Sequence, residues 1–216
     1  MLSNNLVYLV LDGACPDTRV GLWKNEKWLA YAKQETTVLN SIFQLIQKCL
    51  SEAELKLTDI DAFVYNEGPG SQLGIRLCSM AIQTWKALPE WHASRIYCYR
   101  STDLAKLLIQ KESSDEKDFT LICDYRQGRW IRCDSDKDTI SLIDEDALKS
   151  ISGKCYHLAQ RKAWQKPPVN CHPITLDLQT RPECLQLPGL LQELSRPRIF
   201  LPEDPSYKQW TPVRHS

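Results

Sequence analysis

Residues that could hold a phosphate or another anion are concentrated in one turn of this chain. The turn is Gly68-Pro69-Gly70-Ser71, and Gly74 and Arg76 follow closely; three of the eight glycines lie here. The turn comes directly after the hydrophobic run 62–65. A strand, a tight turn and a helix N-terminus can bring backbone N–H groups to an anion. The same geometry can instead pack a helix closely on a sheet, and the sequence leaves both interpretations open.

Two aspartates at the ends of apolar runs could bind a metal–nucleotide complex. Asp12 ends the run 7–11 and is followed by Gly13, and Asp124 ends the run 119–123. Carboxylates at strand ends can bind Mg²⁺. However, residues 14–16 are Ala-Cys-Pro and offer no hydroxyl group to a phosphate. We therefore favour a structural turn at Asp12 and regard any nucleotide site there as vestigial.

Other patterns that carry chemistry are absent from the sequence. The four histidines have no partner at helical spacing, and no Cys-x-x-Cys, Gly-x-Ser-x-Gly or phosphate-loop motif occurs. We therefore expect no catalytic residue, metal or cofactor. The nine cysteines are expected to serve as small, free hydrophobic residues. Their odd number also argues against a complete disulfide framework.

The composition is that of an ordinary soluble domain of 216 residues, with 27 basic and 27 acidic side chains. Such a balance does not favour direct binding to nucleic acid, which depends on clustered Lys and Arg. No apolar run approaches the roughly 20 residues that span a bilayer. We expect a cytoplasmic protein without membrane contact.

The elements that position the turn follow from hydrophobic periodicity. Strands are expected at 7–11, 19–23, 27–32, 62–65, 96–99, 119–123 and 129–133, and helices at 38–53, 74–88 and 104–111. This order predicts an α/β, ribonuclease-H-like lobe at residues 1–112. The charged segment 112–118 is the candidate linker to a second lobe at 113–216. The hydrophobic periodicity after Lys154 is too weak to assign helices or strands, and the fold after Pro167 is not predicted.

The first two helices carry more apolar surface than one sheet can cover. Apolar residues fill arcs of roughly 160° and 240°, whereas a helix on a sheet needs an arc of about 100° or a little more. Either a protein partner or the C-terminal part of the chain could cover the excess. The candidate partner-binding residues are Leu39, Phe43, Ile46, Ile75, Met80 and Ile82.

Taken together, these motifs resemble the TsaB (YeaZ) family. Residues 68–76, Gly-Pro-Gly-Ser-Gln-Leu-Gly-Ile-Arg, are similar to its Gly-Pro-Gly-Ser-Phe-Thr-Gly-Leu-Arg signature, with Gln72-Leu73 as a departure. The stretch 124–128, Asp-Tyr-Arg-Gln-Gly, resembles its Asp-Ala-Arg-x-Gly turn, and 205–207 resembles its Pro-x-Tyr close. The resemblance is good over residues 6–133 and faint afterwards.

The resemblance implies an actin-like ATPase (ASKHA) fold of two ribonuclease-H-like lobes, the second reduced. It also implies a non-catalytic scaffold for the threonylcarbamoyladenosine (t6A) modification of tRNA. Such a scaffold pairs with a TsaD-like subunit through its first two helices, and a TsaE-like ATPase is recruited; tRNA is contacted only indirectly. TsaD carries paired metal-binding histidines on its first helix, whereas the helix 38–53 has none. The open alternatives are a homodimer and a small actin-fold nucleotide-dependent phosphotransferase or hydrolase.

Overall fold

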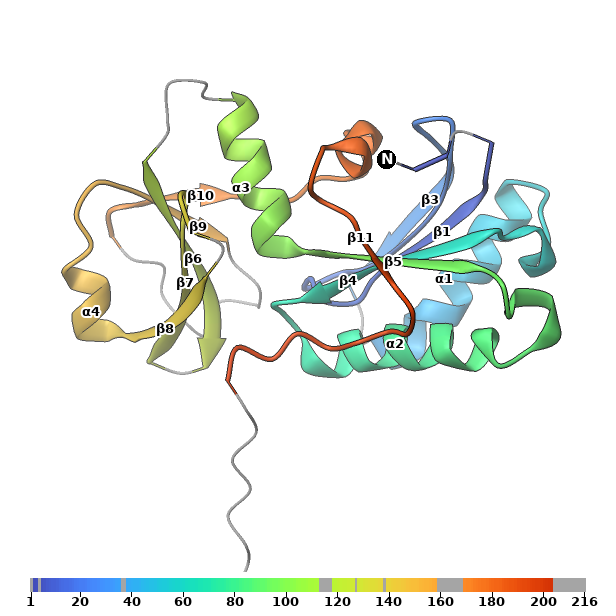
Figure 1. The fold of residues 1–216 in the computed structure, drawn as a ribbon, viewed down its shortest axis with the longest axis horizontal. Helices are drawn as coiled ribbons and strands as arrows, with labels where there is room; N and C mark the ends of the chain where they lie inside the picture. The colour runs from blue at the N-terminus through green and yellow to red at the C-terminus, as the bar shows by residue number, and fades with distance from the viewer. Residues whose placement is uncertain are drawn as a thin grey trace, which may run out of the picture.

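The protein folds into two β-sheets with a helix between them (Figure 1). The computed structural model describes residues 2–3, 5–35, 38–112, 118–126, 128–137, 139–158 and 169–203. The helix between the sheets is α3 (Ser101–Glu112). None of the described helices is long and apolar enough to span a membrane. The predicted α/β class is confirmed.

The first sheet has the strand order β11-β5-β4-β1-β2-β3. Its strands are β1 (Tyr8–Asp12), β2 (Thr18–Lys24), β3 (Lys27–Gln34), β4 (Ala62–Gly68), β5 (Arg95–Arg100) and β11 (Gln192–Leu194). The first three form an antiparallel meander, and β4 and β5 run parallel to β1. Asn25 and Glu26 have positive φ angles of 51° and 62°. They form the two-residue turn whose twist matches a hairpin.

Helices α1 (Val38–Glu52) and α2 (Gln72–Lys86) cover one face of this sheet. Alternate residues of β1 and β4, such as Leu9 and Phe63, point toward these helices and are fully buried. Phe63 stacks on Trp85 of α2, with ring centroids 5.3 Å apart. Because β3, β4 and β5 all run parallel to β1, both helices return the chain in the same direction. The N-terminal halves of α1 and α2 therefore lie at the same end of the sheet.

The second sheet repeats this topology. Its order is β10-β9-β6-β7-β8, with strands β6 (Phe119–Arg126), β7 (Arg129–Asp134), β8 (Ile140–Asp144), β9 (Lys154–Leu158) and β10 (Cys171–Ile174). A meander is again followed by two parallel strands. In the place of the 15-residue α1, this lobe has the 5-residue α4 (Glu145–Lys149). The expected second, reduced ribonuclease-H-like lobe is therefore present.

The sequence predictions fit the first lobe better than the second. Each strand and helix expected within residues 7–133 is present, with ends shifted by a few residues. The elements α4 and β8 to β11 were not predicted. Short 3₁₀ helices also occur at Leu57–Asp59, Pro89–Trp91 and Pro182–Gln186.

One hydrophobic core extends across both lobes. It joins the face of the first sheet that is turned away from α1 and α2 with α3 and the inner face of the second sheet. The chain then returns to the first lobe: Leu178 and Leu185 enter this core, and β11 pairs with β5. Trp23 donates its indole N–H to the carbonyl of Pro182 at 3.2 Å. Residues 113–216 were expected to form the second lobe. Their described part also adds a strand and core side chains to the first lobe.

A C-terminal strap, residues 195–203, connects the two lobes. The Glu67 carboxylate, with a side chain only 2% exposed, accepts hydrogen bonds from Arg198 (2.6 Å) and Arg100 (2.8 Å). Beyond these bonds, Glu203 forms ion pairs with Arg126 and Arg129 of the second sheet, at 3.4 and 3.2 Å. The strap is therefore held by charge pairs to each lobe, through Arg198 to the first and through Glu203 to the second.

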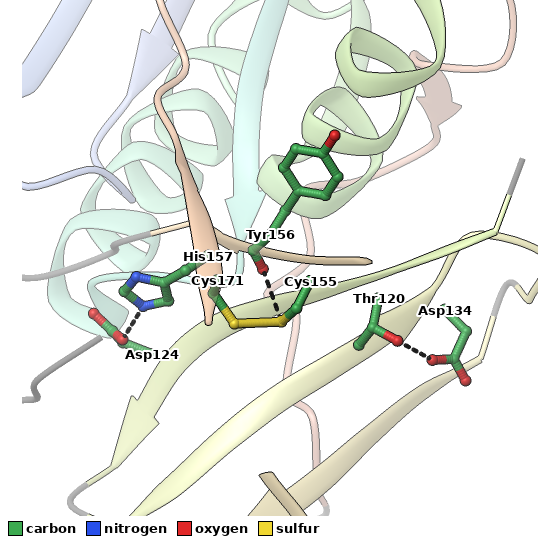
Figure 2. The surroundings of a disulfide bond; sticks show 7 residues. All are labelled: Thr120, Asp124, Asp134, Cys155, Tyr156, His157 and Cys171. Atoms are coloured by element: carbon green, nitrogen blue, oxygen red, sulfur yellow. Dashed lines mark hydrogen bonds and ion pairs between the residues drawn. A yellow bond between two sulfur atoms is a disulfide. The ribbon is translucent and has the colours of Figure 1, made fainter. Parts of the chain in front are cut away.

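The expectation that all nine cysteines are free is wrong for one pair. Cys155 and Cys171 occupy neighbouring positions on β9 and β10 and form a disulfide (Figure 2). The other seven are free, and six of these are buried. Burial as small hydrophobic residues therefore describes most of the cysteines, as predicted.

Replacing Glu67 with Gln tests the anchor of the strap in the first lobe. Burial raises the pKa of Glu67, but the hydrogen bonds from Arg198 and Arg100 outweigh it, so the pKa lies below the ordinary 4.5. A lowered pKa gives stability that is present above pH 4.5 and is lost as the pH falls through the folded-state pKa. We expect Glu67→Gln to lower the unfolding free energy by about 2 kcal/mol at neutral pH.

The measurement is urea unfolding of both proteins from neutral to acid pH. The difference between wild type and Glu67→Gln should shrink as the pH falls below 4.5. A difference that stays constant through this range would contradict the assigned role, because other acidic groups titrate equally in both proteins.

Candidate functional site

The glycine-rich turn joins β4 to α2 and is held from inside the protein. Gly68 has a φ of +117°, a conformation that L side chains rarely adopt. Ser71 is the N-cap of α2, and its Oγ accepts the backbone N–H of Gly74 at 3.4 Å. The N–H of Ser71 donates to the carbonyl of Ala14 at 2.9 Å. Two of the N–H groups that could have bound an anion thus have protein acceptors.

Gly74 brings the start of α2 into direct contact with the loop after β1. A Cβ on Gly74 would lie 1.9 Å from the carbonyl oxygen of Gly13, and one on Gly13 would lie 2.8 Å from that of Gly74. Neither distance is possible for real atoms, so this approach requires glycine on both sides. Of the two interpretations of the turn, the structure supports close packing of a helix on a sheet.

Asp12 organises the same loop. Its Oδ1 accepts the N–H groups of Ala14 (3.0 Å) and Cys15 (3.3 Å) and the side-chain amide of Asn66 (3.2 Å). Its Oδ2 accepts the Tyr99 hydroxyl (3.2 Å) and the Cys15 thiol (3.3 Å). Burial and the nearby Asp12 charge raise the pKa of Cys15, which keeps it a thiol donor. Five donors fill the acceptor capacity of a carboxylate, so a metal would have to displace them.

Asn66 is a residue whose role the sequence analysis missed. Its Nδ2 also donates to Ser101 Oγ at 2.8 Å, and its Oδ1 accepts the N–H of Gly68 at 3.0 Å. Asn66 therefore ties Asp12 to the turn and to the start of α3. The sequence did contain a signal for this role, because Asn66 directly follows the predicted strand 62–65 and precedes the glycines of the turn.

Asp124 lies in the other lobe and has a different partner. It pairs with His157 Nε2 at 2.8 Å, and both side chains are 5% exposed (Figure 2). The two aspartates are thus bonded within separate lobes. Among the described residues, no cluster of three His, Cys, Asp or Glu side chains is arranged to hold a metal.

Helices α1 and α2 carry four of the large apolar residues that are exposed in the described part of the chain. Leu39 and Phe43 of α1 are 57% and 53% exposed, and Leu73 and Met80 of α2 are 54% and 62% exposed. We call these four residues the helix-pair surface. Leu39 and Phe43 lie in the N-terminal half of α1, Leu73 lies in the first turn of α2, and Met80 lies near the middle of α2. Large exposed apolar areas on a protein surface typically mark interaction sites.

The predicted partner-binding residues divide into two groups. Leu39, Phe43 and Met80 are exposed, whereas Ile46, Ile75 and Ile82 are at most 5% exposed and belong to the interior. The helical wheel showed the width of the apolar arc but could not show which part of it the sheet would cover. The three isoleucines are thereby removed from the candidate surface.

Leu73 belongs to the surface although the sequence analysis did not select it. The helix was expected to begin at Gly74, but α2 begins at Gln72 and therefore includes Leu73. Leu73 lies about two turns before Met80, so the two side chains are on the same side of the helix. Arg76 lies between them on the exposed side. It has no hydrogen bond or ion pair with another described residue and is available to a partner. The segment Pro205-Ser206-Tyr207, which resembles the Pro-x-Tyr motif of the family, lies outside the described residues.

Gly74→Ala tests the contact that holds α2. In an ordinary helix interior this substitution stabilises a protein by about 1 kcal/mol. Here the added methyl group meets backbone atoms of Gly13. We therefore expect a loss of about 1–3 kcal/mol, which is typical of overpacking.

Chemical denaturation measures this loss. Gln83→Ala, at an exposed position of the same helix, should change stability by less than about 0.5 kcal/mol. A stabilised Gly74→Ala protein would show that the close approach does not constrain α2.

The comparisons with known proteins concern the same elements. A family model described as TsaD, tRNA N6-adenosine threonylcarbamoyltransferase, matches residues 36–88, which include α1, β4, the turn and α2. No curated protein matches the sequence.

Two solved structures are similar over most of the chain. YeaZ from Pseudomonas aeruginosa has a TM-score of 0.58 at 13% identity, covering 85% of this chain and 91% of that one. An uncharacterised protein with similarity to peptidase YEAZ from the same organism has a TM-score of 0.59 at 13% identity, covering 85% and 90%. The resemblance to the TsaB (YeaZ) family is thus confirmed at the level of the fold.

Proposed function

We propose that this chain is a non-catalytic scaffold subunit for t6A modification of tRNA. It would bind a TsaD-like threonylcarbamoyltransferase through α1 and α2. One observation carries the proposal: the four exposed apolar residues of the helix-pair surface all lie within residues 36–88, the stretch that the TsaD family model matches.

The chemistry of the surface fits a helical partner. Two helices that run side by side in the same direction present apolar side chains at helical spacing, which suits packing against another pair of helices. Burying four large side chains that are about half exposed would favour association through the hydrophobic effect. Arg76, in the middle of the α2 stripe, would provide a polar contact that fixes the register of the complex.

The buried polar groups support a scaffold rather than a catalyst. The alternative, a small actin-fold phosphotransferase or hydrolase, would need Asp12 and Asp124 to bind a metal–nucleotide. Asp12 instead accepts five hydrogen bonds from its own lobe, and Asp124 pairs with His157. The turn at 68–71 contributes to the packing of α2.

Further assignments belong to the same proposal. Residues 1–112 carry the partner surface, and residues 113–216 form the reduced lobe and the segments that return to the first. A TsaE-like ATPase would join the complex, tRNA would be contacted only indirectly, and the setting would be cytoplasmic. The same surface could form a homodimer when the partner is absent.

The test is light scattering of this protein, alone and mixed with the TsaD-like protein of the same organism. We expect a one-to-one complex with the wild type. Phe43→Asp and Met80→Asp should each weaken it about 30-fold or more, because a charge would be buried in an apolar contact. Leu29→Asp is the matched control, since Leu29 is an apolar residue 44% exposed that belongs to β3 and not to either helix.

The possible results separate the alternatives. Equal weakening by all three variants would contradict the helix-pair surface, and no complex with the wild type would contradict the assigned partner. Dimers of the wild type that Phe43→Asp abolishes would instead indicate self-association through the same helices. Stabilisation by Mg-ATP that Asp12→Asn removes would favour the enzyme.

A further inference from the structure

Arg76 is a cation that lies between two apolar residues of the helix-pair surface. It follows Leu73 by one turn of α2 and precedes Met80 by another, so the three side chains are on the same side of the helix. All three residues are exposed. A partner that covers both Leu73 and Met80 therefore also covers Arg76.

The other charged side chains of the two helices have partners within the chain. Lys48 and Glu52 of α1 form an ion pair at 3.8 Å, and the Nζ of Lys86 in α2 donates to two backbone carbonyls that follow the helix. In the described part of the chain, Arg76 has no hydrogen bond or ion pair. Its guanidinium group is therefore available to a group outside this chain.

A purely apolar partner surface over Arg76 would be unfavourable. A guanidinium group that loses its water without gaining an acceptor carries a desolvation cost that can exceed the gain from the surrounding contacts. The backbone carbonyls of a partner helix are used in that helix's own hydrogen bonds, so the acceptor must be a side chain. A carboxylate accepts two N–H groups and neutralises the charge. The complementary group is therefore an Asp or Glu side chain.

The surroundings of Arg76 do not favour a nucleic-acid phosphate. Phosphate binding depends on clustered Lys and Arg. The exposed neighbours of Arg76 on this side of α2 are apolar or neutral, namely Leu73, Met80, Gln83 and Thr84. An isolated cation among such neighbours suits a protein interface, in which Arg is enriched and other charges are depleted.

A second copy of this chain matches Arg76 poorly. The acidic residue that the two helices contain is Glu52, the last residue of α1, and it already pairs with Lys48. In a homodimer through α1 and α2, Arg76 would have to break that ion pair to gain a carboxylate from these helices. The charges therefore favour a different protein over a second copy.

We propose that Arg76 forms an ion pair with a carboxylate of the partner protein, and that this pair favours the complex over self-association. The inference rests on the proposed function, in which a TsaD-like subunit binds α1 and α2. Leu73 and Met80 lie on either side of the ion pair and exclude water from it, which strengthens the attraction between the charges. The partner is thus a protein with an acidic side chain within an apolar helical surface.

The first experiment measures the affinity of the full-length proteins by isothermal titration calorimetry. Arg76→Gln should weaken the complex about 30-fold or more, because the partner's carboxylate would be left buried and unpaired. Lys111→Gln is the matched control, since it removes the same charge from an exposed position of α3, which packs on the other face of the first sheet. It should change the affinity less than about twofold.

The second experiment identifies the carboxylate by cross-linking of Arg76→Lys with a carbodiimide. The reagent activates a carboxylate, and the introduced amine then forms an amide bond with it as a urea leaves. Mass spectrometry should find an Asp or Glu of the partner in the linked peptide. The wild type should give no link at this position, because a guanidinium group does not react. Reversing the linked residue to Arg should weaken binding to the wild type and restore binding to Arg76→Glu.

The results separate this inference from the proposed function. A complex that Arg76→Gln and Lys111→Gln bind equally well would overturn the inference and leave the proposed function intact. No complex with the wild type would contradict both. Wild-type dimers that Arg76→Gln and Glu52→Gln each abolish would overturn the inference, because the carboxylate would come from a second copy. Loss of tRNA binding in Arg76→Gln with an unchanged protein complex would also overturn it, because Arg76 would then bind phosphate.

Discussion

The arrangement of the first lobe depends on the contact between the backbones of Gly13 and Gly74. A side chain on either residue would overlap the other's carbonyl group. The contact seats α2 against the loop after β1, and Asp12 and Asn66 hold that loop with hydrogen bonds to the turn. While α2 is fixed in this way, Leu73 and Met80 on its outer side remain exposed.

The two lobes show how the same strand order can support different surfaces. In the first, two long helices cover the sheet and leave an apolar exterior. In the second, the described residues provide one short helix, and a cavity lined by Trp130 remains. The shared core and the C-terminal strap join the lobes, with Glu67 and Glu203 as its charged anchors. These contacts favour a fixed arrangement of the lobes, which suits a scaffold.

The first lobe was predictable because its signals are local and strong. Alternation in the strands, the apolar arcs of α1 and α2 and the glycines of the turn each specify an element within a few residues. The second lobe was less predictable because β8 to β10 are short and partly exposed. The return of the chain to pair β11 with β5 joins residues about a hundred positions apart. No local pattern contains such a pairing.

The sequence by itself determined the α/β class, the position of the turn and the excess of apolar residues on two helices. Periodicity records these features, because each depends on neighbouring residues along the chain. Only the tertiary structure decided that Ile46, Ile75 and Ile82 are buried and that Leu39, Phe43 and Met80 are exposed. It also decided that Asp12 is fully hydrogen-bonded inside the protein. The reason is the same in each case: burial and hydrogen bonding depend on distant segments that fold against the residue.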